Sequence, residues 1–171
     1  MPFIMKNVVP WGRNLDEYRK MFSLSETELK SHIAGFGDGL ASFNAECGRL
    51  GGQVTSFDPI YQFSATQLEK VIDEAKRRLV AQTAGNDTTA NAETVRDINE
   101  LEQRHKETVE SFLDDFEAGK RQGRYINHEM PFKIPFPDNT FDLGLSSHFL
   151  LLYPGLGFNF HRQSFEEMLR T

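Results

Sequence analysis

The spacing of hydrophobic residues predicts five helices. Apolar residues recur at intervals of three and four, as on one buried helix face, in the ranges 15–22, 40–50, 64–82, 95–118 and 160–170. Residues 1–30 are therefore expected to form an N-terminal helical segment. The two long central helices are expected to form a helical insertion over 64–118, between the second and third strands.

Short apolar runs between these helices predict four strands. The runs are 31–34, 53–57, 124–127 and 141–148. Strands that alternate with helices are typical of an α/β fold with a parallel sheet. The last run is almost continuously apolar, as in a strand that is covered on both faces. The pattern predicts one Rossmann-like domain over 1–171, with a doubly wound, mostly parallel sheet.

Composition narrows the possible partners and the compartment. The 171 residues carry a net charge of −6, which argues against sequence-independent binding of nucleic acid. Cys47 is the single cysteine, so no internal disulfide can form, and no apolar run approaches the length of a membrane span. We expect a cytoplasmic protein without nucleic-acid or membrane partners.

Aromatic residues are numerous and supply much of the expected core. Most of a set of five phenylalanines are expected in the core, and one or two of them to line an adenine or substrate pocket: Phe132, Phe136, Phe141, Phe149 and Phe158. Trp11 and Tyr18 are expected to pack in the interior, with covering of the active site as the alternative.

The strongest candidate for a ligand site is the turn Gly35-Phe36-Gly37-Asp38-Gly39, which joins the first strand to a helix. Its glycines permit a sharp turn and close approach of a ligand to the backbone. Asp58 follows the second strand, where an acid can accept hydrogen bonds from ribose hydroxyls. The layout is typical of a nucleotide-binding βαβ unit. The alternatives are a tight turn without ligand, an Asp-Pro turn at Asp58, and a helix-dipole role for Asp38.

Leu40 bears on the class of nucleotide. The dinucleotide fingerprint carries its third glycine at this position, so an NAD-type oxidoreductase is disfavoured. The five histidines have no compact ligand spacing, so no metal site is expected.

Three segments resemble class I S-adenosylmethionine-dependent methyltransferases. They are residues 35–39, 54–58 and 134–143, the last reading Ile-Pro-Phe-Pro-Asp-Asn-Thr-Phe-Asp-Leu. The run from about 8 to 171 is also similar to bacterial methyltransferase-like proteins, with a Pro-Trp-Gly-Arg start and a Ser-His-Phe-Leu fourth strand. The resemblance implies the class I methyltransferase fold, with S-adenosylmethionine at the carboxyl ends of the strands.

The resemblance also implies roles for single residues. The glycine turn would face the methionine part of the cofactor, and Asp58 with Pro59 its ribose. Glu129 or Asn127 would lie near the adenine.

The end of the fourth strand would face the methyl donor and a small-molecule acceptor. Its residues are Ser146, Ser147 and His148. His148 is the candidate general base, because an imidazole titrates near neutral pH.

Two features differ from the pattern of the resembled family. Ile33 stands where an acid is common, and the sequence lacks the family's fifth strand and last hairpin. We therefore expect a domain truncated after the fourth strand, with either self-association through the strand edge at 143–150 or marginal stability. The alternative functions are a non-catalytic remnant that binds S-adenosylmethionine, or a scaffold.

Overall fold

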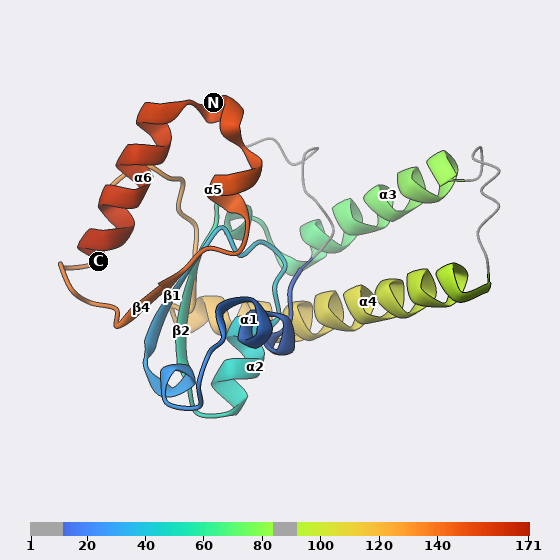
Figure 1. Ribbon diagram of the computed structural model, residues 1–171, viewed down its shortest axis with the longest axis horizontal. Coiled ribbons are helices and arrows are strands. Elements are labelled where there is room, and N and C mark those ends of the chain that lie inside the picture. The colour runs from blue at the N-terminus through green and yellow to red at the C-terminus, as the bar shows by residue number, and fades with distance from the viewer. Residues whose placement is uncertain (1–11, 84–91) are drawn as a thin grey trace.

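A four-stranded parallel sheet forms the centre of the structure, a computed structural model that describes residues 12–83 and 92–171 (Figure 1). The strand order is β3-β2-β1-β4. The strands are β1 (His32–Phe36), β2 (Gln53–Phe57), β3 (Tyr125–Ile126) and β4 (Leu143–Leu145). The predicted α/β class with a parallel sheet is confirmed. Residues 1–11 of the predicted N-terminal segment lie outside the described residues.

Each of the five predicted helices is present in the described residues close to its predicted range, and a short helix, at 149–152, is present that was not predicted. They are α1 (Leu15–Phe22), α2 (Phe43–Arg49), α3 (Ala65–Thr83), α4 (Ala92–Arg121), α5 (Phe149–Leu152) and α6 (Phe158–Arg170). Single 3₁₀ turns are η2 (Glu28–Lys30), η3 (Pro59–Gln62) and η4 (Pro154–Leu156). In the part of the chain that is described, no helix is both long and apolar enough to cross a bilayer.

Helix α1 begins where its sequence provides an N-terminal cap. The Glu17 N–H donates to Asn14 Oδ1, and the Asn14 N–H donates to Glu17 Oε2, both at 2.9 Å. This reciprocal capping box satisfies two backbone donors that the first turn would leave unpaired. The fixed start orients the apolar face of α1, so that Tyr18 is fully buried.

Alternating strand residues face two different layers. Ile33, Val54 and Leu145 pack with α1 and α2 in one hydrophobic cluster. Phe36 and Phe57 point to the opposite face and pack with the 127–142 segment and α6. Both faces of β1 and β2 are therefore covered, as expected of parallel strands.

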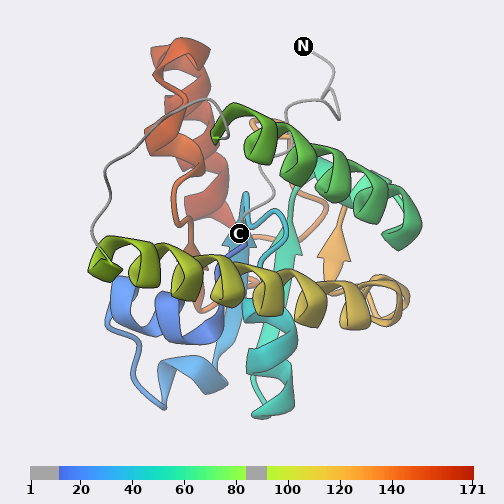
Figure 2. The ribbon, with the colours of Figure 1, turned by 90° about the vertical axis from the view of Figure 1, so that its right-hand side faces the viewer.

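The second half of α4 belongs to the core. Phe112 and Phe116 are fully buried and pack against Tyr61 and Tyr125. Figure 2 shows α4 running across the sheet with α3 above it. The far ends of both helices extend away from the sheet (Figure 1). The span predicted as a helical insertion thus supplies a layer of the domain as well as a projection.

The predicted fourth strand is much shorter than expected. β4 ends at Leu145, and residues 149–152 are helical. The reason is that the chain turns over the glycine turn: a Cβ built on Gly37 would lie 2.5 Å from the Cβ of Phe149. The edge predicted over 143–150 is therefore reduced to three strand residues.

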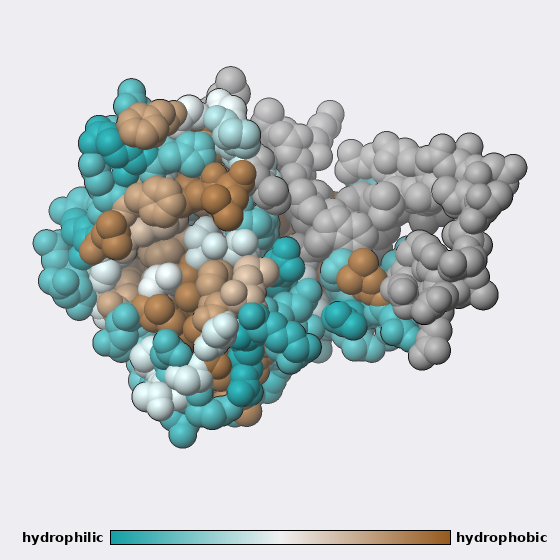
Figure 3. Space-filling view, in the orientation of Figure 1, coloured by the Kyte–Doolittle hydropathy of each residue, from teal (hydrophilic) through white to brown (hydrophobic). Residues whose placement is uncertain are grey.

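Apolar side chains remain exposed on the C-terminal helices. Figure 3 shows hydrophobic surface over α5 and α6. The most exposed of these side chains are Leu151, Phe158 and Leu169. Phe158 does not belong to the core, where it was expected: it is the first residue of α6 and is 79% exposed.

We expect Phe112→Ala to lower the free energy of unfolding by about 3–5 kcal/mol, because the change empties a fully buried site. The matched control is Phe165→Ala on α6, whose ring is 51% exposed. Its effect should stay within about 1 kcal/mol. Urea denaturation measures both, and equal losses would contradict the placement of α4 in the core.

Candidate functional site

The carboxyl ends of all four strands lie at one edge of the sheet, because every pairing is parallel. The residues predicted for the site follow β1, β2, β3 and β4 in turn, so the fold gathers them along this edge. In open parallel sheets, ligands bind at this edge, where neighbouring loops diverge.

Gly35 leaves the space that the turn's acid occupies. A Cβ built on Gly35 would lie 1.9 Å from Asp38 Oδ2, so a larger residue would displace the carboxyl group. Asp38 is only 4% exposed and accepts hydrogen bonds from Tyr18 Oη and Ser56 Oγ, both at 2.6 Å. Burial raises the pKa of Asp38, and the two hydroxyl donors oppose that rise. Asp38 thus ties the turn to α1 and β2.

The turn itself presents backbone to the edge of the sheet. Gly37 and Gly39 have φ values of +70° and +56°, a region that glycine adopts without steric cost. In residues 12–83 and 92–171, no atom lies within 4 Å of a Cβ built on Gly39, apart from the glycine and its two chain neighbours. The Phe36 ring is buried and stacks on Phe57, so only its backbone belongs to the turn.

Asp58 connects the end of β2 to the glycine turn. Its Oδ2 accepts from the Gly39 N–H at 3.0 Å, and its Oδ1 accepts from the Ile60 N–H at 2.8 Å. A carboxylate has about four lone-pair positions, so each oxygen can accept a further donor. Burial is the main cause that raises the pKa of Asp58 to about 6, against the lowering effect of the two N–H donors.

A cavity of about 410 Å³ opens between the segments that follow β2 and β3. Pro59 and Glu129, both predicted for the site, line it. Its other lining residues are Gln62, Asn127, His128, Phe132 and Lys133. Phe132 is 67% exposed and thus lies outside the core, at a pocket, as expected for one or two of the phenylalanines.

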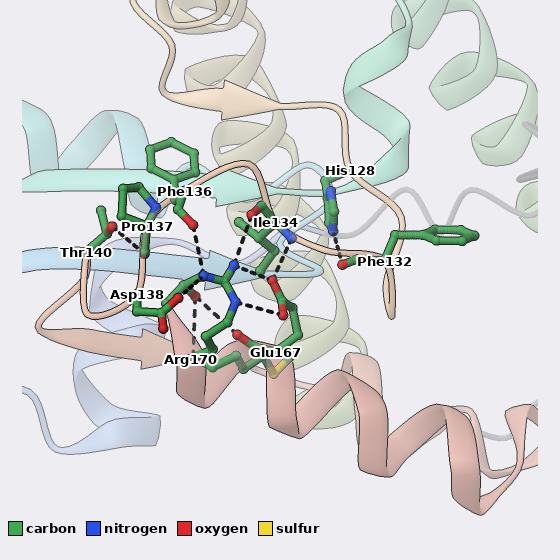
Figure 4. Close-up of polar contacts among 11 residues, drawn as sticks. His128, Phe132, Ile134, Phe136, Pro137, Asp138, Thr140, Glu167 and Arg170 are labelled. Atoms are coloured by element: carbon green, nitrogen blue, oxygen red, sulfur yellow. Dashed lines mark hydrogen bonds and ion pairs between the residues drawn. The ribbon is translucent and has the colours of Figure 1, made fainter.

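Helix α6 fixes the segment that forms one wall of the cavity (Figure 4). The Arg170 guanidinium donates to the carbonyls of Ile134 and Phe136 and pairs with Asp138. Glu167 accepts from the Ile134 N–H at 2.7 Å. Two α6 residues, Glu167 and Arg170, thus bind the first part of the segment 134–143 through its backbone groups and Asp138.

The three predicted residues after β4 lie at the same edge but outside the lining of the cavity. Ser147 Oγ is 2.7 Å from His148 Nδ1, and the buried hydroxyl of Ser146 has no hydrogen-bond partner among the described residues. Desolvation lowers the pKa of the half-buried His148, and the charge of Arg13 lowers it further. Both effects favour the neutral imidazole.

Three residues of the cavity have no signal in the sequence: Gln62, His128 and Lys133 meet only because η3 and the segment after β3 are adjacent. Tyr18, which the sequence offers either as a packed residue or as a cover of the site, is buried and reaches Asp38 from α1. The capping box at Asn14 is readable in the sequence and would have fixed the orientation of Tyr18. Among the described residues, no three side chains of His, Cys, Asp or Glu are grouped as metal ligands.

We expect Tyr18→Phe to lower the free energy of unfolding by about 1–3 kcal/mol, because the buried Asp38 loses one of its two hydroxyl donors. Tyr153→Phe removes a hydroxyl from a ring that is 45% exposed, and should change stability by less than about 0.5 kcal/mol. Guanidinium denaturation compares the two. If the Tyr18→Phe protein is as stable as the wild type, the Tyr18 hydroxyl does not stabilise the buried Asp38 carboxyl group.

Comparison with known proteins gives one clear relationship. No protein-family model matches the chain, and no solved structure matches it. The chain is 32% identical over 171 residues to the uncharacterized protein MJ0045 of Methanocaldococcus jannaschii. The similarity covers 97% of this chain and 75% of that protein. The chain therefore belongs to the same protein family as MJ0045.

Proposed function

We propose that this protein binds S-adenosylmethionine at the carboxyl edge of its sheet and transfers the methyl group to a small-molecule acceptor. One observation carries the proposal. The Asp58 carboxylate accepts from the Gly39 N–H of the glycine turn, and the next residue, Pro59, lines a cavity of about 410 Å³. This arrangement fits a ligand that joins a sugar, a flat base and an extended tail.

The adenosine part of the ligand fits Asp58 and the cavity. The free lone pairs of Asp58 can accept from both ribose hydroxyls. The cavity volume lies within the range of small-molecule sites. The exposed Phe132 ring offers a surface for stacking, and the amides of Gln62 and Asn127 can bond the edge of a base.

The methionine part fits the glycine turn. Gly39 has open space where a side chain would stand, so a ligand can lie against bare backbone there. This assignment, like the class I methyltransferase type of the fold, rests on the resemblance of residues 35–39 and 134–143.

When bound, S-adenosylmethionine supplies a methyl group on positively charged sulfur. The protein's contribution is to position the acceptor in line with that methyl group and to accept a proton. A neutral His148 imidazole can accept that proton. If Ser147 Oγ accepts from Nδ1–H, then Nε2 keeps its lone pair and can take the proton of a hydroxyl or amine.

A titration of S-adenosylmethionine and of S-adenosylhomocysteine into the protein tests the proposal, with NAD as a comparison. We expect micromolar binding of the first two ligands only. Asp58→Asn should weaken it by about 1–3 kcal/mol, roughly fivefold to 150-fold, because a carboxylate that bonds ribose becomes a neutral amide. The matched control is Asp16→Asn, an exposed acid paired with Lys20 on α1.

Four results would count against this assignment. Preference for NAD would favour an oxidoreductase. If Asp58→Asn binds the ligand as tightly as the wild type, Asp58 does not bind the ribose, and its role is only to accept from the N–H groups of Gly39 and Ile60. Failure of a folded protein to bind any of the ligands would favour a scaffold. Binding without methyl transfer would favour the non-catalytic alternative.

Binding should also depend on pH. The pKa of Asp58 is raised to about 6, so the carboxylate that accepts from ribose is lost as the pH falls through that value. The dissociation constant of S-adenosylhomocysteine should therefore rise about tenfold per pH unit below about pH 6, and change little above it.

Asp58→Asn should show no such slope between pH 5 and 7, because an amide does not titrate there. His128 also lines the cavity, and burial lowers its pKa, so His128→Gln is the second control. The slope should persist in His128→Gln. A slope that disappears in His128→Gln and remains in Asp58→Asn would assign the titration to the imidazole.

A further inference from the structure

Arg13 is fixed beside the glycine turn by its neighbours. A Cβ built on Gly12 would lie 2.0 Å from the carbonyl oxygen of Leu40, the residue that follows the turn. On the other side, Asn14 caps α1, and the Leu15 N–H donates to Glu46 at 3.1 Å. The backbone of Arg13 is therefore held between two anchored residues at the edge that carries the site.

The Arg13 side chain is 39% exposed, and within the described part of the chain its guanidinium has an ion pair but no hydrogen-bonded anion. Its Nε is shielded from solvent and, in residues 12–83 and 92–171, has no hydrogen-bond partner. The ion pair with Glu17 is long, at 3.7 Å between Nη1 and Oε1. Glu17 is also engaged in the capping box of α1. A shielded donor on a cation is costly to leave unpaired, so the site favours an anionic partner.

The charge of Arg13 reaches groups on three neighbouring elements. It lowers the pKa of His148 after β4 and of His105 on α4, and it partly offsets the rise in the pKa of Tyr18 on α1. Asp38 does not neutralise it by a hydrogen bond, since its oxygens accept from Tyr18 and Ser56. Arg13 follows Gly12, which packs on Leu40 directly after the glycine turn, and it does not line the β3 cavity.

We propose that Arg13 binds the carboxylate of the ligand and makes the site specific for adenosyl amino acids. The proposal rests on the proposed function and adds its specificity: with adenosine at Asp58 and the amino-acid part at the glycine turn, the ligand's carboxylate lies on the Arg13 side. The planar guanidinium can bond both carboxylate oxygens.

A pair of ligands tests this assignment. S-adenosylhomocysteine carries the amino-acid carboxylate, and 5′-methylthioadenosine has the same adenosine thioether without it. Titration into the 171-residue protein should show that Arg13→Gln weakens S-adenosylhomocysteine at least about tenfold. The affinity for 5′-methylthioadenosine should change less than about twofold. Arg13→Lys should recover part of the loss, because it restores the charge but not the bidentate geometry.

Arg19→Gln is the matched control, because Arg19 lies on the same helix and pairs with exposed Glu26. It should leave both affinities unchanged. Equal weakening of the two ligands by Arg13→Gln, or no weakening, would overturn the role of Arg13 while leaving the proposed function intact. Failure of the wild type to bind either ligand would overturn both.

Discussion

A buried carboxylate holds the site together. Asp38 lies where the glycine turn, α1 and β2 meet, and accepts from Tyr18 and Ser56 in space that Gly35 leaves free. An unpaired carboxylate at this depth would be strongly unfavourable, so both hydroxyl donors must be in place. The position of α1, and with it Arg13, therefore depends on the same contact that shapes the turn.

On the two sides of the glycine turn, the edge of the sheet carries two regions of different chemistry. Toward β3, Asp58 and the cavity offer a carboxylate, amides and the exposed ring of Phe132. Toward β4, Arg13 and His148 offer a cation and a possible proton acceptor. The glycine turn lies between them. A ligand with a neutral base at one end and a carboxylate at the other matches this polarity.

The sequence predicted the order and type of the helices and strands better than their boundaries. Residues 53–57 form β2 as expected, because a β-branched and aromatic run between glycines and Asp-Pro has few alternatives. The run 149–152 could form a helix or a strand, and its packing over Gly37 decides for the helix. Phe132 reads as core from its chemistry alone, whereas its exposure depends on where α6 holds the neighbouring segment. Tyr18 and Asp38 are 20 residues apart, so their contact is a product of tertiary structure.

The central claim is that this edge binds an adenosyl amino acid, and a crystal structure with S-adenosylhomocysteine tests it most directly. The account predicts ribose hydroxyls on Asp58, the base in the cavity beside Phe132, and the amino-acid part along the glycine turn. Ligand bound elsewhere, or a reversed orientation with the base near His148, would contradict it.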